Sequence, residues 1–159
     1  MLARQATVAL PLLKTADNLS IMHAQHASIL VVDDDAVLSE ALTKVLRKEG
    51  FEVVAQPSAE NAMGYLRTAA NNVDLVITDS AMSGAEEMSF VSAVKASFPA
   101  VPVMLINAYG HWGEWAEALR AGAFEYLSKP LDKTELLAAV WRALNHPNKG
   151  RAWPENNPQ

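Results

Sequence analysis

The chain of 159 residues contains no cysteine, which excludes disulfide bonds, a thiolate nucleophile and any zinc site that depends on sulfur ligands. A reducing compartment is compatible with that absence. Basic residues are also in short supply, because 13 Lys and Arg face 18 Asp and Glu and leave a net charge of −5. Since nucleic-acid binding needs a basic face for the phosphates, we expect no direct contact with nucleic acid.

Long apolar runs are absent as well. None approaches the ~20 residues of a membrane-spanning helix, and the short apolar stretch near the N-terminus is interrupted by Pro11 and Lys14. We therefore expect neither a membrane segment nor a signal peptide, and a cytoplasmic location. Half of the residues are hydrophobic, which suits one domain with a sizeable core.

The chain does have a regular alternation of two patterns. Short apolar runs suited to buried strands alternate with helical stripes, in which apolar residues recur three and four positions apart. The predicted strands cover 29–32, 51–54, 73–77, 101–106 and 124–127. A helical stripe follows each of them, and Asp132 opens the last one as a capping residue. This alternation predicts an α/β fold with a parallel sheet and helices on both faces.

The two ends of the chain lack this pattern. Residues 1–27 show no convincing period, and residues 147–159 are polar and rich in Pro and Asn. We expect both to be flexible extensions of a single domain at 28–146.

Polar residues gather where the predicted strands end. They are Asp33, Asp34 and Asp35 after the first strand, Asp79 after the third, Asn107 after the fourth and Lys129 after the fifth. Ligands of open parallel sheets bind beyond the carboxyl ends of the strands, so these side chains should share one edge. Clustered carboxylates repel one another unless a cation offsets them, and Mg²⁺ (or Mn²⁺) prefers such oxygen ligands. One carboxylate could then accept a phosphoryl group, with the metal ion and Lys129 neutralising its oxygens.

Three stretches, "ILVVDDD", "VDLVITDSAMSG" and "GAFEYLSKPLD", resemble the receiver domain of bacterial response regulators, over about residues 28–146. The resemblance implies a doubly wound, flavodoxin-like (βα)5 sandwich with sheet order 2-1-3-4-5. It also implies a stand-alone receiver that accepts a phosphoryl group from a sensor histidine kinase or a histidine phosphotransfer protein. Such a domain is a phosphoacceptor that assists its own phosphorylation and dephosphorylation rather than an enzyme on an external substrate. Its output would be changed contacts with an unknown downstream protein, on the face of the fourth helix, fifth strand and fifth helix.

The same resemblance assigns roles to individual residues. Asp79 matches the phosphoacceptor, and Asp33, Asp34, Asp79 and the backbone carbonyl of Ala81 match the Mg²⁺ ligands. Lys129 matches the lysine that contacts the phosphoryl group, followed by a bond to Pro130 that is cis in the family. Tyr126 matches the aromatic switch residue, and Ala108 the small residue that leaves the pocket open.

Two positions depart from the family pattern. Asn107 stands where the family has Ser or Thr, whose hydroxyl binds the phosphoryl group and moves with the aromatic residue. An amide can still donate a hydrogen bond, but it reaches further, so we expect weaker coupling between Asp79 and Tyr126. After Asp79 the chain reads Met82-Ser-Gly-Ala-Glu-Glu87 in place of the frequent Met-Pro-Gly-Met-Asp-Gly. This second change bears on loop geometry and removes no ligand.

Trp112 and Trp115 lie about one turn apart on the predicted helix at 111–121. If Ala116 and Leu119 face inward, both indoles point outward to the partner face, where tryptophan is a favoured contact residue. The alternative is that one ring folds back against the protein, because tryptophan is usually well buried. Trp141, on the last helix, is expected to pack against the protein.

Two other functions remain open on sequence grounds. The first is a receiver that signals by binding alone, without phosphate, which Asn107 keeps possible. The second is a haloacid-dehalogenase-type phosphatase, because "VVDDDAV" also fits that family's motif with Asp33 as nucleophile and Asp35 as acid. That family needs a later acidic pair, and the only candidates, Asp132 and Glu135, fit a helix cap better.

Overall fold

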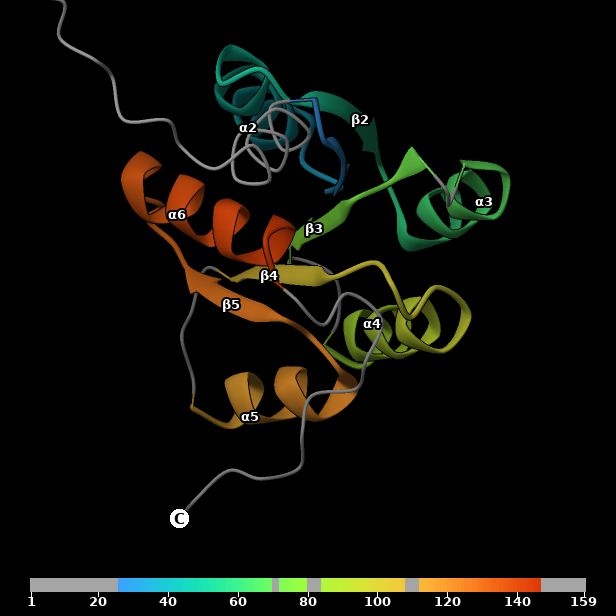
Figure 1. Ribbon diagram of the computed structural model, residues 1–159. Helices are drawn as coiled ribbons and strands as arrows, with labels where there is room; N and C mark the ends of the chain where they lie inside the picture. Colours follow the sequence, from blue (N-terminus) through green and yellow to red (C-terminus); the bar gives the residue numbers. More distant parts are fainter. Residues whose placement is uncertain (1–25, 70–71, 80–83, 108–111, 147–159) are drawn as a thin grey trace, which may run out of the picture.

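The computed structural model describes residues 26–69, 72–79, 84–107 and 112–146. Five strands and five helices alternate along this part of the chain (Figure 1). The strands are β1 (Ser28–Val32), β2 (Glu52–Gln56), β3 (Leu75–Asp79), β4 (Val103–Asn107) and β5 (Glu125–Ser128). The helices are α2 (Ala36–Lys48), α3 (Ala59–Ala69), α4 (Gly84–Ser97), α5 (Trp112–Ala121) and α6 (Lys133–Leu144).

All strand pairs are parallel, and the sheet order is β2-β1-β3-β4-β5. The chain therefore winds outward from β1 in both directions, and the strand order reverses between β1 and β3. The predicted fold class and strand order are confirmed. The carboxyl ends of β1 and β3 flank this reversal, which is where doubly wound sheets bind their ligands.

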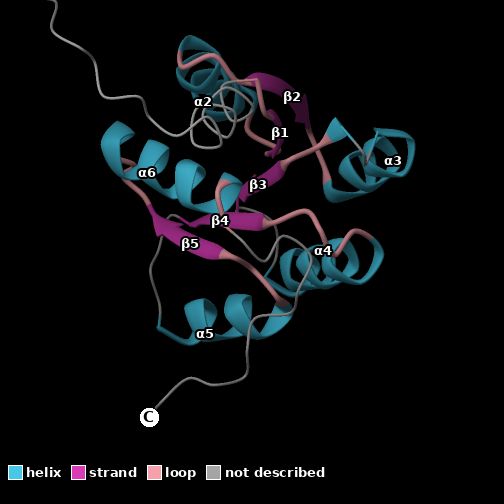
Figure 2. Ribbon diagram, viewed as in Figure 1, coloured by secondary structure: helices cyan, strands magenta, loops and turns pink. Residues whose placement is uncertain are grey.

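Helices cover both faces of the sheet (Figure 2). On one face, α2 and α6 pack over alternate strand residues such as Ile29, Val31 and Ile77. On the other face, α3, α4 and α5 pack over Leu30, Val32 and the remaining alternate residues. Strand residues on both faces are fully buried, which explains why the strands read as continuous apolar runs rather than alternating ones.

Four strands, β2 to β5, begin and end later than predicted. Thr78, Asp79 and Asn107 were expected to follow strands, but they form the last rungs of β3 and β4, where Asp79 pairs with Ile106 and Asn107 with Ser128. The backbone ladder continues past the apolar run, because backbone hydrogen bonding does not depend on the polarity of the side chain. The polar side chains are thus held on the rigid sheet rather than on loops.

Local signals at the helix ends agree with the structure. The Asp132 carboxylate accepts a hydrogen bond from the N–H of Thr134 (2.8 Å) at the start of α6. The Ser58 hydroxyl accepts from the N–H of Asn61 (3.1 Å) before α3. Trp141 packs against Phe51 with ring centroids 5.5 Å apart, as expected for a helix-packing residue. None of the described helices is long and apolar enough to cross a membrane.

Candidate functional site

Asp33 lies directly after β1, and the neighbouring backbone fixes its position. Its N–H donates to the carbonyl of Gln56 on β2 (3.1 Å), which extends the β1–β2 ladder by one residue. One of its carboxylate oxygens accepts from the N–H of Asp35 (2.8 Å). The side chain is buried at the carboxyl edge of the sheet, with little contact with water.

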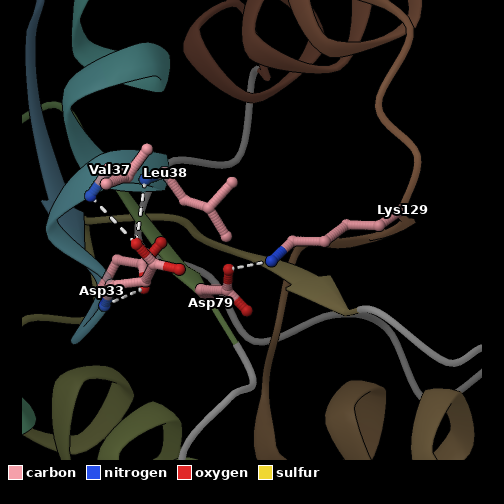
Figure 3. Close-up of polar contacts among 6 residues, drawn as sticks. Asp33, Val37, Leu38, Asp79 and Lys129 are labelled. Atoms are coloured by element: carbon pink, nitrogen blue, oxygen red, sulfur yellow. Dashed lines mark hydrogen bonds and ion pairs between the residues drawn. The ribbon is translucent and has the colours of Figure 1, made fainter.

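Asp35 has a different role. Its carboxylate accepts hydrogen bonds from the N–H groups of Val37 (2.9 Å) and Leu38 (3.2 Å), and so it caps the N-terminus of α2 (Figure 3). A capping carboxylate satisfies backbone donors that would otherwise lack partners. Asp35 is therefore occupied as a helix cap, and it is not positioned as the free acid that the phosphatase interpretation requires.

Asp79 ends β3 and is buried beside Asp33. The ammonium of Lys129, which follows β5, forms an ion pair with the Oδ2 atom of Asp79 (Figure 3). Lys129 is held in place by its own backbone, because its N–H donates to the carbonyl of Asn107 (2.6 Å). The Lys129–Pro130 peptide bond is cis, as the family pattern predicts. Three strands separated in sequence thus bring Asp33, Asp79 and Lys129 together.

The electrostatics of the site are those of crowded carboxylates. The pKa of Asp33 is raised from 3.8 to about 6, first because burial disfavours its charged form, and further because of the adjacent Asp79. The hydrogen bond from Asp35 and the charge of Lys129 oppose this rise without cancelling it. Two buried carboxylates that repel each other, with one ammonium to offset them, suit a divalent cation with oxygen ligands.

The remaining predicted metal ligands are less closely gathered. Asp34 is exposed beside Asp33, and Ala81 lies outside the described residues. Within the described ranges, no three His or acidic side chains converge as a ready-made metal cluster. This fits Mg²⁺, which is usually held by one or two carboxylates and keeps several waters.

The predicted switch residues lie on the α3–α4–α5 face of the sheet or at its edge. Asn107 is half-buried at the last rung of β4, and Ala108 lies outside the described residues. Tyr126 pairs with Leu105 and packs into the core under this face, where its hydroxyl oxygen is buried. The ring is thus half-buried against the core, with its hydroxyl oxygen covered.

The orientation of α5 differs from the prediction. Leu119, expected to face inward, is 37% exposed, whereas Ala118 is fully buried. A small side chain at position 118 allows α5 to lie close to α4 and β5, and this rotates Leu119 outward. Trp115 is 42% exposed beside it, while the side chain of Trp112, the first residue of α5, is outside the described set. Trp115 and Leu119, four residues apart, give this helix an apolar outer face.

One exposed residue near the site escaped sequence reasoning. Val37 is 76% exposed in the first turn of α2, next to the half-exposed Leu38 and close to Asp33. The pattern of apolar residues along a helix cannot reveal this exposure. It depends on where the helix begins relative to the sheet, and the first turn of α2 lies beyond the part of the sheet that would cover it. Apolar side chains exposed beside a reactive group are what a docking protein would meet first.

Comparison with known proteins decides the family. Residues 29–141 match the sequence profile of the response regulator receiver domain. The chain belongs to this family. Receiver domains are signalling phosphoacceptor domains, phosphorylated by histidine kinases and acting on downstream effectors, and they bind Mg²⁺ at the phosphorylation site. The phosphatase interpretation of "VVDDDAV" is therefore replaced.

The curated relatives that the chain matches are longer proteins. The DNA-binding transcriptional regulator NtrC of Rhizobium meliloti is 32% identical over 133 residues, which are 84% of this chain and 27% of that protein. The response regulator protein FleR of Pseudomonas aeruginosa is 40% identical over 116 residues, 73% of this chain and 24% of that protein. The chain spans about a quarter of the length of these curated relatives.

Two solved structures match over most of their length. A response regulator receiver domain protein from Clostridium thermocellum superposes with a TM-score of 0.70 at 30% identity, covering 75% of this chain and 94% of that one. CheY of Borrelia burgdorferi, solved in a CheX-CheY-BeF3-Mg complex, superposes with a TM-score of 0.67 at 26% identity, covering 72% of this chain and 86% of that one.

Proposed function

We propose that this receiver accepts a phosphoryl group on Asp79, in a Mg²⁺-dependent transfer from a phosphohistidine of a sensor kinase or phosphotransfer protein. The buried ion pair between Asp79 and Lys129, beside Asp33, is the observation that carries the proposal. In the transfer, the bond from phosphorus to the histidine nitrogen breaks as a bond to a carboxylate oxygen of Asp79 forms. The imidazole leaves, and the aspartyl phosphate remains on the protein.

The two buried carboxylates have different surroundings, which suit Asp33 to metal binding and Asp79 to phosphoryl acceptance. One carboxylate oxygen of Asp33 already accepts a hydrogen bond from the N–H of Asp35, which holds this side chain in place beside Asp79 and suits it to bind a metal ion. Asp79 ends a rigid strand and is paired with an ammonium that can follow the charge onto the phosphoryl oxygens. Mg²⁺ would be held by Asp33, Asp79, Asp34 and the carbonyl of Ala81, where it neutralises the charge of the transferring group.

Incubation with acetyl phosphate and Mg²⁺, followed by intact-mass and peptide mass spectrometry, tests the proposal. One phosphoryl group should appear on the peptide that contains Asp79, and it should be lost in Asp79→Asn and when EDTA removes the metal. Asp74→Asn is a matched control, because this carboxylate lies at the other end of β3 and accepts from the N–H of Ser28 (2.9 Å). A label on Asp33 instead of Asp79 would overturn the assignment.

The exposed apolar residues of α2 support a protein as the donor. Val37 and Leu38 border the site, so a donor domain that brings its histidine to Asp79 would cover them. Val37→Asp should then slow transfer from purified, autophosphorylated histidine kinases and leave the acetyl phosphate rate unchanged. Equal slowing with both donors would mean that Val37 affects the chemistry and not docking.

A second function, binding that does not require phosphate, has its own support. Tyr126 is already half-buried against the core with its hydroxyl oxygen covered, in a protein that carries no phosphoryl group. Asn107 stands where the family's hydroxyl would link the phosphoryl group to that tyrosine. Under this alternative, a partner isolated with the wild-type chain binds Asp79→Asn with unchanged affinity. For the leading proposal, the affinity should change on phosphorylation and stay at the unphosphorylated value in Asp79→Asn.

A further inference from the structure

An apolar cavity of about 200 Å³, open to solvent along the edge of α2 that carries Leu38 and Ala41, lies between α2 and α6, on the face of the sheet opposite Tyr126. Its inner wall is built from apolar side chains of α2, α6 and the sheet. They are Leu42 and Val45 of α2, Leu136 of α6, and Val31 and Ile77 of the sheet, with Leu131 before α6. Its mouth opens at the phosphorylation site, where Asp33, Asp79 and Lys129 border it. Leu38 reaches from α2 toward that ion pair (Figure 3).

The inner wall offers water few hydrogen-bond partners, although the mouth is open to solvent. A buried water needs two to four polar partners, and the inner wall offers aliphatic carbon instead. The cavity is therefore suited to an apolar molecule.

The charges at the mouth indicate that this molecule is neutral. Lys129 is paired with Asp79, and Lys133 is paired with Glu49 across the two helices (2.9 Å). Each ammonium at the rim thus already has a carboxylate partner. A charged ligand would have to break one of these pairs, whereas a neutral ligand leaves both intact.

The volume sets the size of the occupant. An apolar protein cavity of about 150 Å³ is known to take a benzene molecule, so 200 Å³ holds one ring with a small substituent or a short branched alkane. We propose that the α2–α6 cavity binds a small, neutral, apolar molecule of single-ring size and that binding changes the phosphorylation rate of Asp79. The second half rests on the proposed phosphorylation, whereas binding can be measured without phosphate.

Ligand binding and phosphorylation are linked because the cavity opens at the phosphorylation site. A molecule in the cavity contacts the side chains that surround Lys129, so it alters how readily this ammonium leaves Asp79 for an incoming phosphoryl group. If the ligand binds the two states of the site differently, phosphorylation must change the ligand's affinity by the same factor.

Toluene is a suitable probe, titrated into the full chain labelled with ¹³C on Leu and Val methyl groups. The methyl signals of Leu42, Val45 and Leu136 should shift together and saturate, with nuclear Overhauser effects to the toluene ring. Ala41→Phe, which fills the cavity from α2, should weaken binding at least about tenfold. Ala138→Phe is the matched control on the exposed side of α6, outside the cavity, and should bind as the wild type does.

Three outcomes would overturn the proposal. The first is an absence of saturable shifts in the wild type, and the second is equal binding by Ala41→Phe. The third is a set of methyl contacts to residues 1–25 or to a second copy, which would show that protein fills the space. The direct contacts between toluene and Leu42 keep the test valid if Ala41→Phe folds poorly.

The effect on phosphorylation is tested separately. If toluene binds and the rate of phosphorylation by acetyl phosphate does not change, the regulatory part of the proposal is refuted and binding stands. If the chain is never phosphorylated on Asp79, the proposed function is refuted and binding again stands.

Discussion

The ammonium of Lys129 pairs directly with the carboxylate of Asp79, although 50 residues separate them in the chain. The pair joins the ends of β3 and β5, which are not neighbours in the sheet, because β4 lies between them. Lys129 can span this gap because it has a long side chain and because its backbone N–H is anchored to the carbonyl of Asn107. The cation thus reaches the carboxylate from the side and leaves the open edge of the sheet to an incoming phosphoryl group.

Replacing Lys129 by Met should separate metal binding from phosphoryl transfer. Without the ammonium, the carboxylates attract a divalent ion more strongly, so the affinity for Mg²⁺ should rise about three- to tenfold. The phosphoryl oxygens lose a partner, so phosphorylation by acetyl phosphate should slow by about ten- to a hundredfold. Titration calorimetry and intact-mass kinetics measure the two effects.

Lys133→Met is the matched control for that experiment. Lys133 lies four residues further on, and its partner is the exposed Glu49 rather than a buried carboxylate. Both Mg²⁺ affinity and phosphorylation rate should stay within about twofold of the wild type, because exposed pairs contribute little. A Lys129→Met variant that behaves like this control would remove Lys129 from the mechanism.

The raised pKa of Asp33 makes the stability of the metal-free protein depend on pH. Between its unfolded value near 3.8 and its folded value of about 6, the native state binds more protons than the unfolded state. The free energy of unfolding therefore falls as the pH rises through this window, and the loss is complete at neutral pH. Asp33→Asn removes this loss, and its uncharged oxygen can still accept from the N–H of Asp35.

Urea denaturation in EDTA, near pH 5 and near pH 7.5, measures the effect. Asp33→Asn should be more stable than the wild type at the higher pH, by at most about 3 kcal/mol, and the difference should shrink at the lower pH. Added Mg²⁺ should stabilise the wild type and have little effect on the variant, because it binds the charged native site. A difference that is independent of pH would show that Asp33 does not titrate in this window.

Much of the site could be predicted from the sequence, because short sequence patterns determine where the strands lie and which residues follow them. Buried strands read as apolar runs, and parallel strands deliver their carboxyl ends to one edge, which placed Asp33, Asp79 and Lys129 together. The strand ends were less predictable, because Asp79 and Asn107 belong to the ladder through their backbones while their side chains resemble loop residues. Asp35 differed from its two neighbours only in its position one residue before the helix.

Other features depend on how the elements pack, and no local pattern contains them. The stripe on α5 fits either Leu119 or Ala118 as the inward residue, and the close approach to α4 and β5 selects the smaller one. The cavity between α2 and α6 depends on how far apart two helices stand over one sheet face. Leu42 and Val45 look like ordinary core residues in the sequence, although they border a space that side chains of the described chain leave unfilled.

Two glycines predict opposite responses to the same substitution. Gly122, after α5, has φ +103°, and a Cβ there would lie 2.7 Å from Cγ of Lys95. Gly122→Ala should therefore destabilise the protein by about 1–2 kcal/mol. Gly64, inside α3, has open space around the Cβ position, so Gly64→Ala should stabilise by about 0.5–1 kcal/mol. Urea denaturation midpoints test the two variants, provided that the dependence of the unfolding free energy on urea is the same as in the wild type. A change in stability of the same sign in both variants would contradict the argument from backbone conformation.

Asn107 is the position where a single change should alter signalling without altering the chemistry. Its side chain is half-exposed at the end of β4, on the face that holds Tyr126. A Thr hydroxyl sits closer to the backbone than the Asn amide, so it can follow a phosphoryl group inward toward the tyrosine. Asn107→Thr should thus leave the phosphorylation rate within about threefold of the wild type, because the charged groups that stabilise the transfer are unchanged.

The response of Tyr126 is the decisive measurement for that variant. On saturation with acetyl phosphate and Mg²⁺, the ring and amide signals of Tyr126 and of the outer face of α5 should move further in Asn107→Thr than in the wild type. The double variant with Asp79→Asn should abolish both responses, since the shifts must originate at the phosphoacceptor. If the wild type already shows the full response, the Asn107 amide transmits the signal as well as a hydroxyl does, and its presence is no reason to favour phosphate-independent binding.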